Sequence, residues 1–180
     1  MRLKITLLTI LIVLACAATA AAQANQSMYT SLDASKCRTL ESDTSGAGYY
    51  KGQCPGVAGY KLLVEEGDIR QNITIVTPGG KQHSLELWNV IGSSFSFVGQ
   101  KAEWRVQKRS RQTVPVALIV RYNLSNPEDS ARSTSYLTVS KITADRICVT
   151  HKIPPSANAN EEARRAADSA ASQPCLKGEQ

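Results

Sequence analysis

The cysteines constrain this fold more than any other feature of the sequence, because four of them follow an N-terminal segment built like a secretory signal. Arg2 and Lys4 precede the apolar run 5–14, and an alanine-rich stretch follows it. This is the charged, apolar and small-residue order of a cleaved signal. An exported chain folds in an oxidising compartment, where an even number of cysteines favours disulfides. We therefore expect two disulfides among Cys37, Cys54, Cys148 and Cys175.

Four cysteines can pair in three ways, and the sequence leaves the choice open. The order of the segments suggests that Cys37 pairs with Cys54 and closes a local hairpin-like loop. It also suggests that Cys148 pairs with Cys175 and ties the C-terminal segment to a strand. We expect no metal or other cofactor, because the sequence has no Cys-x-x-Cys pair and neither histidine has ligand spacing to a cysteine.

The signal is expected to span residues 1–24, which predicts a periplasmic or secreted protein. Two Ala-x-Ala exits compete, at 20–22 and at 22–24, because signal peptidase needs small side chains at two positions. A lipoprotein anchored at Cys16 is an alternative, since apolar residues precede that cysteine. An uncleaved signal anchor is a third option, although the segment is at the short limit of what spans a bilayer.

Removal of the signal leaves about 156 residues, the length of one domain with a single core. Arg2 and Lys4 leave with it, which lowers the formal net charge from +6 to +4. A charge of that size does not indicate nucleic-acid binding. We expect no transmembrane segment in the mature chain, because its closest candidate, 114–122, is short and contains Pro115.

Short β-rich stretches alternate with turn residues along most of the chain. This spacing predicts a mainly β fold, either an antiparallel sandwich or a barrel-like sheet. The clearest hairpin joins 73–77 to 84–88 through the turn 78–81, whose two glycines allow the positive φ of a tight turn. The strand-like stretches are 38–41, 48–51, 60–65, 70–77, 82–88, 102–107, 114–123, 134–142 and 146–152.

Both ends of the exported part differ from this β pattern. Residues 25–36 are polar and small, which predicts a flexible leader before a single β-rich domain over 37–180. Alanines at helical spacing predict one C-terminal α-helix at about 159–172, with Asn158 as its cap and Glu161 as the capping-box partner.

A basic run with one tryptophan is the strongest candidate for a partner surface. Period-two alternation places Trp104 on one side of its strand and Arg105 on the other. Such a surface could bind an anionic envelope polymer or an acidic protein, and a solvated hairpin tip is the alternative interpretation. The run consists of Lys101, Trp104, Arg105, Lys108, Arg109 and Arg111.

The sequence contains no set of residues that predicts catalysis. The hydrolase signatures Gly-x-Ser-x-Gly and His-Glu-x-x-His are missing from it. His83 and His151 are the natural candidates for a general base, but neither has a nucleophile motif beside it. Carboxylates cluster at 65–68, where Gly67-Asp68 between two strand-like runs indicates a turn.

Two stretches resemble known families. The segment from Gly48 to Asp68 resembles a group of exported bacterial proteins without assigned function, which implies a bacterial envelope or secreted setting. Ser45-Gly46-Ala47-Gly48-Tyr49 is similar to the Ser-Gly-x-x-Tyr signature of periplasmic lysozyme inhibitors, small β-barrel proteins that insert such a loop into a hydrolase cleft. This second resemblance implies that Ser45 and Tyr49 are inserted contacts. A net positive charge disfavours a basic lysozyme as the target.

These observations favour a non-catalytic exported binding or envelope-associated module whose ligand is unknown. A periplasmic inhibitor of a hydrolase such as lysozyme is the first alternative. A hydrolase with an unrecognised site is the second.

Overall fold

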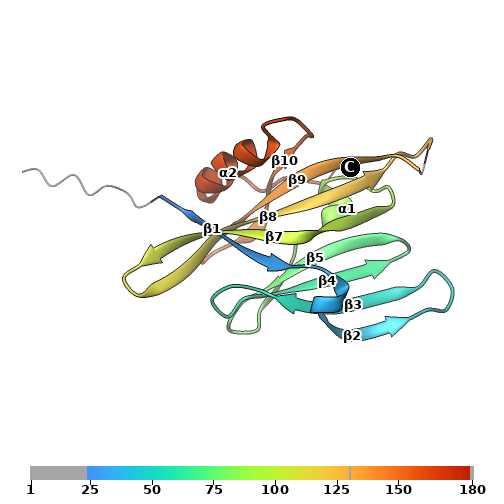
Figure 1. Ribbon diagram of the computed structural model, residues 1–180, viewed down its shortest axis with the longest axis horizontal. Helices are drawn as coiled ribbons and strands as arrows, with labels where there is room; N and C mark the ends of the chain where they lie inside the picture. Colours follow the sequence, from blue (N-terminus) through green and yellow to red (C-terminus); the bar gives the residue numbers. More distant parts are fainter. Residues whose placement is uncertain (1–23, 130, 179–180) are drawn as a thin grey trace, which may run out of the picture.

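The computed structural model describes residues 24–129 and 131–178, so that Cys16 and the expected signal, apart from Ala24, lie outside the described residues. The chain is mainly β with a helix near its C-terminal end, as the sequence predicts (Figure 1). The strands are β1 (Gln26–Ser31), β2 (Arg38–Asp43), β3 (Tyr49–Pro55), β4 (Lys61–Gly67), β5 (Arg70–Val76), β6 (Gln82–Ser84), β7 (Ser96–Arg109), β8 (Gln112–Ser125), β9 (Ser133–Ile142) and β10 (Ile147–Ile153). The helices are α1 (Leu87–Val90) and α2 (Ala159–Ser169), and Ala34–Lys36 and Ala170–Ser172 form 3₁₀ turns.

The strands form one mixed sheet whose two halves enclose the main core. The order is β10-β9-β8-β7-β5-β4-β3-β2, with β6 beside β5 and β1 beside β7. The halves meet at a short parallel contact, where Arg70 of β5 lies opposite Ser96 of β7. Figure 1 shows β2–β5 below β7–β10, with α2 above them. The sheet is therefore bent into a sandwich-like arrangement rather than closed into a barrel.

Alternating residues of each half fill the core between them. Leu62 of β4 and Ile73 of β5 pack in one cluster with Trp104 of β7 and Leu118 of β8, and all four side chains are fully buried. Residues two apart in a strand share a face, which is why these positions point inward together. Trp104 Nε1 also donates a hydrogen bond of 2.9 Å to Thr30 Oγ1, so the same ring connects β1 to the core.

The helix α2 covers the outer face of β8 and β9. Its small side chains allow close approach to the sheet, where they pack with Ile119 and Leu137. Asn158 precedes the helix, but its side chain forms no capping hydrogen bond, so the predicted capping box is wrong. Within the described parts of the chain, no helix has the length and apolarity to cross a membrane. The buried alanines of this segment are Ala159, Ala163 and Ala167 of α2 and Ala170 of the 3₁₀ turn that follows it.

The two disulfides connect the pairs that the segment order suggests. One joins Cys37, before β2, to Cys54 of β3, with Cα atoms 4.1 Å apart. The other joins Cys148 of β10 to Cys175 beyond α2, with Cα atoms 5.7 Å apart. Two disulfides are compatible with an extracellular location, because such bonds persist in oxidising compartments.

The expectation of a flexible leader over 25–36 is wrong. Residues 26–31 form β1, which pairs antiparallel with β7 from Gln26 opposite Val106 to Ser31 opposite Lys101. The polar composition is misleading because backbone pairing and polar side-chain contacts hold this strand, rather than the burial of its own apolar side chains.

The hairpin predicted over 73–88 is present but shorter. β5 pairs with β6 only from Thr74 opposite Ser84 to Val76 opposite Gln82. Leu87–Val90 forms the helical turn α1 instead of a strand. The backbone N–H of Leu87 donates a hydrogen bond of 3.0 Å to the side-chain oxygen of Asn72, which turns the chain away from the sheet.

Candidate functional site

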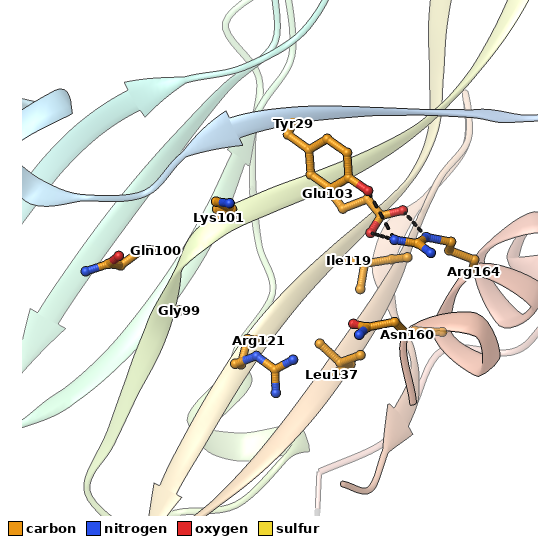
Figure 2. Close-up of a pocket in the computed structure, with 11 residues that line it drawn as sticks. Tyr29, Gly99, Gln100, Lys101, Glu103, Ile119, Arg121, Leu137, Asn160 and Arg164 are labelled. Carbon is orange, nitrogen blue, oxygen red and sulfur yellow. Dashed lines mark hydrogen bonds and ion pairs between the residues drawn. The ribbon is translucent and has the colours of Figure 1, made fainter. Parts of the chain in front are cut away.

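A groove lies between the N-terminal half of α2 and the outer surface of β1, β7, β8 and β9 (Figure 2). Its volume is about 380 Å³, which is within the range of small-ligand sites. Ile119, Leu137 and Ala163 form a buried apolar floor. We call this site the helix groove, and its polar side chains are Tyr29, Gln100, Lys101, Glu103, Arg121, Asn160 and Arg164.

A β-bulge in β7 shapes one wall of the helix groove. Val98 pairs with Tyr122 and Ala102 pairs with Val120, so residues 99–101 all lie opposite Arg121 of β8. A Cβ atom at Gly99 would lie 2.8 Å from the Cβ of Arg121, so glycine permits this close approach. Bulges redirect side chains next to functional sites, and this one carries Lys101 at the edge of the groove.

An ion pair between β7 and α2 closes the other wall. Arg164 Nε donates to Glu103 Oε1 at 2.7 Å, and Arg164 Nη2 donates to Glu103 Oε2 at 3.2 Å and to the Tyr29 hydroxyl at 3.1 Å. Ser27 Oγ donates to Glu103 Oε1 at 2.5 Å. Figure 2 shows Tyr29 and Glu103 converging on the Arg164 guanidinium. The helix is thus joined to both β7 and β1.

A second ion pair lies one helical turn further along α2. Arg105 donates through Nε and Nη2 to the two carboxylate oxygens of Asp168, at 2.8 and 2.9 Å. The remaining guanidinium donors reach the backbone oxygen of Asn25 at 2.8 Å and Ser27 Oγ at 2.5 Å. Because Ser27 accepts from Arg105 and donates to Glu103, it links the two ion pairs. We call the combined set the polar clamp: Asn25, Ser27, Tyr29, Glu103, Arg105, Arg164 and Asp168.

The polar clamp controls the ionisation of Glu103. Burial opposes the charged carboxylate, but the hydrogen bonds from Arg164 and Ser27 and the charges of Arg164 and Arg105 more than offset it. The pKa of Glu103 therefore lies below its usual value. The same hydrogen bond to Glu103 raises the pKa of Arg164, which stays charged.

We expect this arrangement to make stability depend on Glu103 in acid. A carboxyl whose pKa is lowered by folding stabilises the folded state at pH values above its unfolded pKa of about 4.3. This stabilisation disappears as the pH falls through the lower pKa that the group has in the folded state. Glu103→Gln should lower the free energy of unfolding at pH 7 and flatten its decline below about pH 4.5. Urea unfolding at pH 7 to 3 measures both effects, and Glu161→Gln, on the exposed face of α2, is the control. Parallel pH curves for Glu103→Gln and the parent protein would contradict the expectation.

Two cations of the helix groove have no carboxylate partner. Within the described residues, neither Lys101 nor Arg121 forms an ion pair. Arg121 Nη1 donates only to Ser135 Oγ, at 2.8 Å. With Arg164 and Glu103 included, the groove carries two net positive charges. The sequence analysis does not single out Arg121. A signal was present, because Arg121 is a charged residue in the middle of a strand whose neighbouring residues are buried.

The partner surface predicted from the basic run is not a single surface. Trp104 is in the core and Arg105 is buried in the polar clamp, so neither is available to a partner. Alternation placed them on opposite faces correctly, but it could not show that α2 covers the second face. Lys101 belongs to the helix groove. Lys108, Arg109 and Arg111 lie exposed at the β7–β8 turn, which we call the basic tip.

The loop that is similar to the lysozyme-inhibitor signature lies at the end of the β2–β3 hairpin. The Ser45 backbone N–H and hydroxyl both donate to Asp43 Oδ1, at 2.8 and 2.7 Å. Tyr49 opens β3 opposite Asp43 and is partly exposed. All six residues of β2 are exposed because β2 is the edge strand of the sheet, and the Cys37–Cys54 disulfide joins the ends of the hairpin opposite the loop.

The two histidines lie on separate strands and neither is part of a nucleophile–base pair among the described residues. His83 on β6 is half-buried, and burial followed by the charge of Lys81 lowers its pKa. Burial likewise lowers the pKa of His151 on β10. His151 Nδ1 lies 2.9 Å from Thr150 Oγ1, but this hydroxyl is buried and also bonds to the backbone oxygen of Val139.

Comparisons with protein-family models, with curated proteins and with solved structures gave no significant match. In the part of the chain that the structure describes, no group of three or more His, Cys, Asp or Glu side chains is arranged to hold a metal ion.

Proposed function

We propose that this protein is an exported, non-catalytic binding module that holds an anionic ligand in the helix groove. The observation that carries the proposal is the placement of Lys101 and Arg121, two exposed cations without carboxylate partners among the described residues, beside an apolar floor. Arg164 does not add a third free cation, because Glu103 holds it in the polar clamp.

The side chains of the groove indicate the chemistry of the ligand. The planar guanidinium of Arg121 suits two-point hydrogen bonding to a carboxylate or phosphate, and Lys101 adds a compact charge. The floor formed by Ile119, Leu137 and Ala163 suits an apolar or ring portion next to the anionic group. These features fit an anionic polymer or glycolipid of a bacterial envelope.

The setting is part of the same proposal. The signal-like segment, the two disulfides and the resemblance to exported bacterial proteins support a periplasmic or secreted protein. A lipid anchor at Cys16 is the alternative, and mass spectrometry of the protein from its native host distinguishes the two.

The test compares two double substitutions that remove the same net charge. Lys101→Gln with Arg121→Gln should weaken binding to immobilised lipopolysaccharide or peptidoglycan by about tenfold or more, because hydrogen bonds to charged groups each contribute about 1.5–3 kcal/mol. Arg109→Gln with Arg111→Gln, in the basic tip, should leave binding within about twofold. Surface plasmon resonance at low ionic strength measures both. Equal losses in the two variants would show that net charge alone is responsible and would contradict a site in the groove.

A second candidate function is the inhibition of a hydrolase by the loop at Ser45 and Tyr49. The exposure of the loop at the end of the β2–β3 hairpin and the disulfide at the other end of the hairpin favour this alternative, since an inserted loop must be accessible and keep its shape. Ser45→Ala with Tyr49→Ala should then abolish inhibition of lysozyme. Lysozyme activity that a large molar excess of the unmodified protein leaves unchanged would exclude the tested enzyme as the target.

A further inference from the structure

One end of the sheet presents large apolar side chains to solvent around a single arginine. Ile69, Trp88, Phe95 and Tyr49 are 56, 48, 40 and 37 % exposed. The Arg70 guanidinium lies 5.0 Å from the centre of the Phe95 ring. Arg70, Tyr49 and Trp88 also line one hollow of about 330 Å³. We call these five residues the sheet-end surface. Large apolar side chains that are exposed near one another on a protein surface can mark an interaction site.

The turn that carries Ile69 is strained. β4 and β5 are joined by the two residues Asp68 and Ile69, because Gly67 pairs directly with Arg70. Both turn residues have positive φ, +51° and +57°, a conformation that glycine and asparagine adopt readily and that β-branched residues avoid. An exposed isoleucine in this position lowers stability without contributing to the core. Backbone strain of this kind clusters at functional sites such as ligand contacts.

The carboxylates around the sheet-end surface indicate the charge of the partner that it would bind. Glu65 is neutralised by Lys51 at 3.0 Å, and Asp68 pairs with Arg70. Asp43, which lies opposite Tyr49, receives hydrogen bonds only from the neutral Ser45 within the described residues. Glu66 shares the inner face of β4 with Leu62 and Val64 and bonds to Gln71, so it is not part of this surface. The negative charge of Asp43 is therefore left without a cationic partner among the described residues, beside the exposed Tyr49 ring, on a protein whose overall charge is positive. Aromatic faces next to anions attract cations.

We propose that the sheet-end surface docks a partner protein through a segment that carries lysine or arginine beside apolar side chains. The apolar residues contact Ile69 and the hollow between Tyr49 and Trp88, and the cation reaches Asp43. This proposal is independent of the helix groove, which lies against α2 and selects the opposite charge. It is also separate from the basic tip: β7 starts beside Arg70 and ends at the basic tip, so the two surfaces lie at opposite ends of one 14-residue strand.

The test uses a random-peptide library displayed on phage, selected against the oxidised protein and counter-selected against Ile69→Gly. This variant keeps the core and relieves the positive φ, so its thermal midpoint should be equal to or higher than that of the parent protein. Selected peptides should combine Lys or Arg with apolar residues. Their affinity should fall tenfold or more in Ile69→Gly and in Trp88→Ala, and should change less than twofold when Arg109 and Arg111 of the basic tip are replaced with glutamine.

Tryptophan fluorescence shows where such a peptide binds. Trp104 is fully buried and Trp88 is half exposed, so acrylamide quenching reports mainly on Trp88. A tryptophan-free selected peptide should reduce this quenching. Enrichment of acidic peptides, equal selection on Ile69→Gly, or unchanged quenching would overturn the proposal. Sedimentation that shows dimers of the protein alone, lost in Ile69→Gly, would also overturn it, because a second copy would then be the occupant.

Discussion

Asp168→Ala is expected to destabilise the protein by about 3 kcal/mol, the lower end of the range for breaking a buried ion pair. The reason is an asymmetry of burial: the Arg105 side chain is 9 % exposed and the Asp168 side chain 40 %. Loss of Asp168 leaves a buried guanidinium with only neutral acceptors, Ser27 and the backbone oxygen of Asn25. Loss of Arg105 leaves a carboxylate that water can reach.

Arg105→Met should therefore cost less, about 1–2 kcal/mol, because methionine fills much of the volume of the arginine stem and the remaining carboxylate is hydrated. The double variant should be more stable than Asp168→Ala alone, since it contains no unpaired buried charge. Urea unfolding of the two single variants and the double variant measures this order. If the losses in the free energy of unfolding of the two single variants add up to the loss in the double variant, Arg105 and Asp168 do not stabilise each other, contrary to the geometry of the polar clamp.

Trp104→Ala should have the largest effect of any single substitution considered, a loss of about 3–5 kcal/mol, as for other fully buried aromatic side chains. The ring lies in the core between the two halves of the sheet, with its centre 6.0 Å from that of Tyr60, and its Nε1 donates to Thr30 of β1. The cavity and the lost hydrogen bond both weaken the contact between β1 and the core. At this chain length, the expected fall in the thermal midpoint is roughly 10 °C.

Trp104→Phe is the matched control. It keeps an aromatic ring in the core and removes only the hydrogen bond to Thr30, so it should lose less than half as much stability as Trp104→Ala. Unfolding monitored by circular dichroism is the appropriate measurement, because both variants remove a fluorescent tryptophan. A loss below about 1 kcal/mol for Trp104→Ala would contradict the burial of this side chain.

Much of the architecture could be predicted from local patterns. Alternation over 102–107 identified which residues of β7 point inward, and turn residues at 78–81 located a real turn. The alanine stripe located α2, because helical spacing is visible within about ten residues. The same patterns failed for β1, whose residues are polar and whose stability comes from the strand and helix beside it.

The candidate site was far less predictable. Glu103 and Arg164 are 61 positions apart, and Arg105 and Asp168 are 63 positions apart. No periodicity connects charges at such separations. The basic run was interpreted as one surface because its residues are neighbours in the sequence, whereas adjacent residues of a strand point to opposite faces and meet different parts of the fold.

The sequence by itself thus determined the class of this protein: a β-rich chain with a C-terminal helix and four cysteines for two disulfides, whose pairing it suggested but left open. Only the tertiary structure decided which charges are available to a ligand. It buried Arg105 under α2, left Lys101 and Arg121 without a carboxylate partner among the described residues beside an apolar floor, and exposed Ile69 in a strained turn. The physical reason is that secondary structure follows from contacts within a few residues, while burial and charge pairing depend on which distant segments pack together.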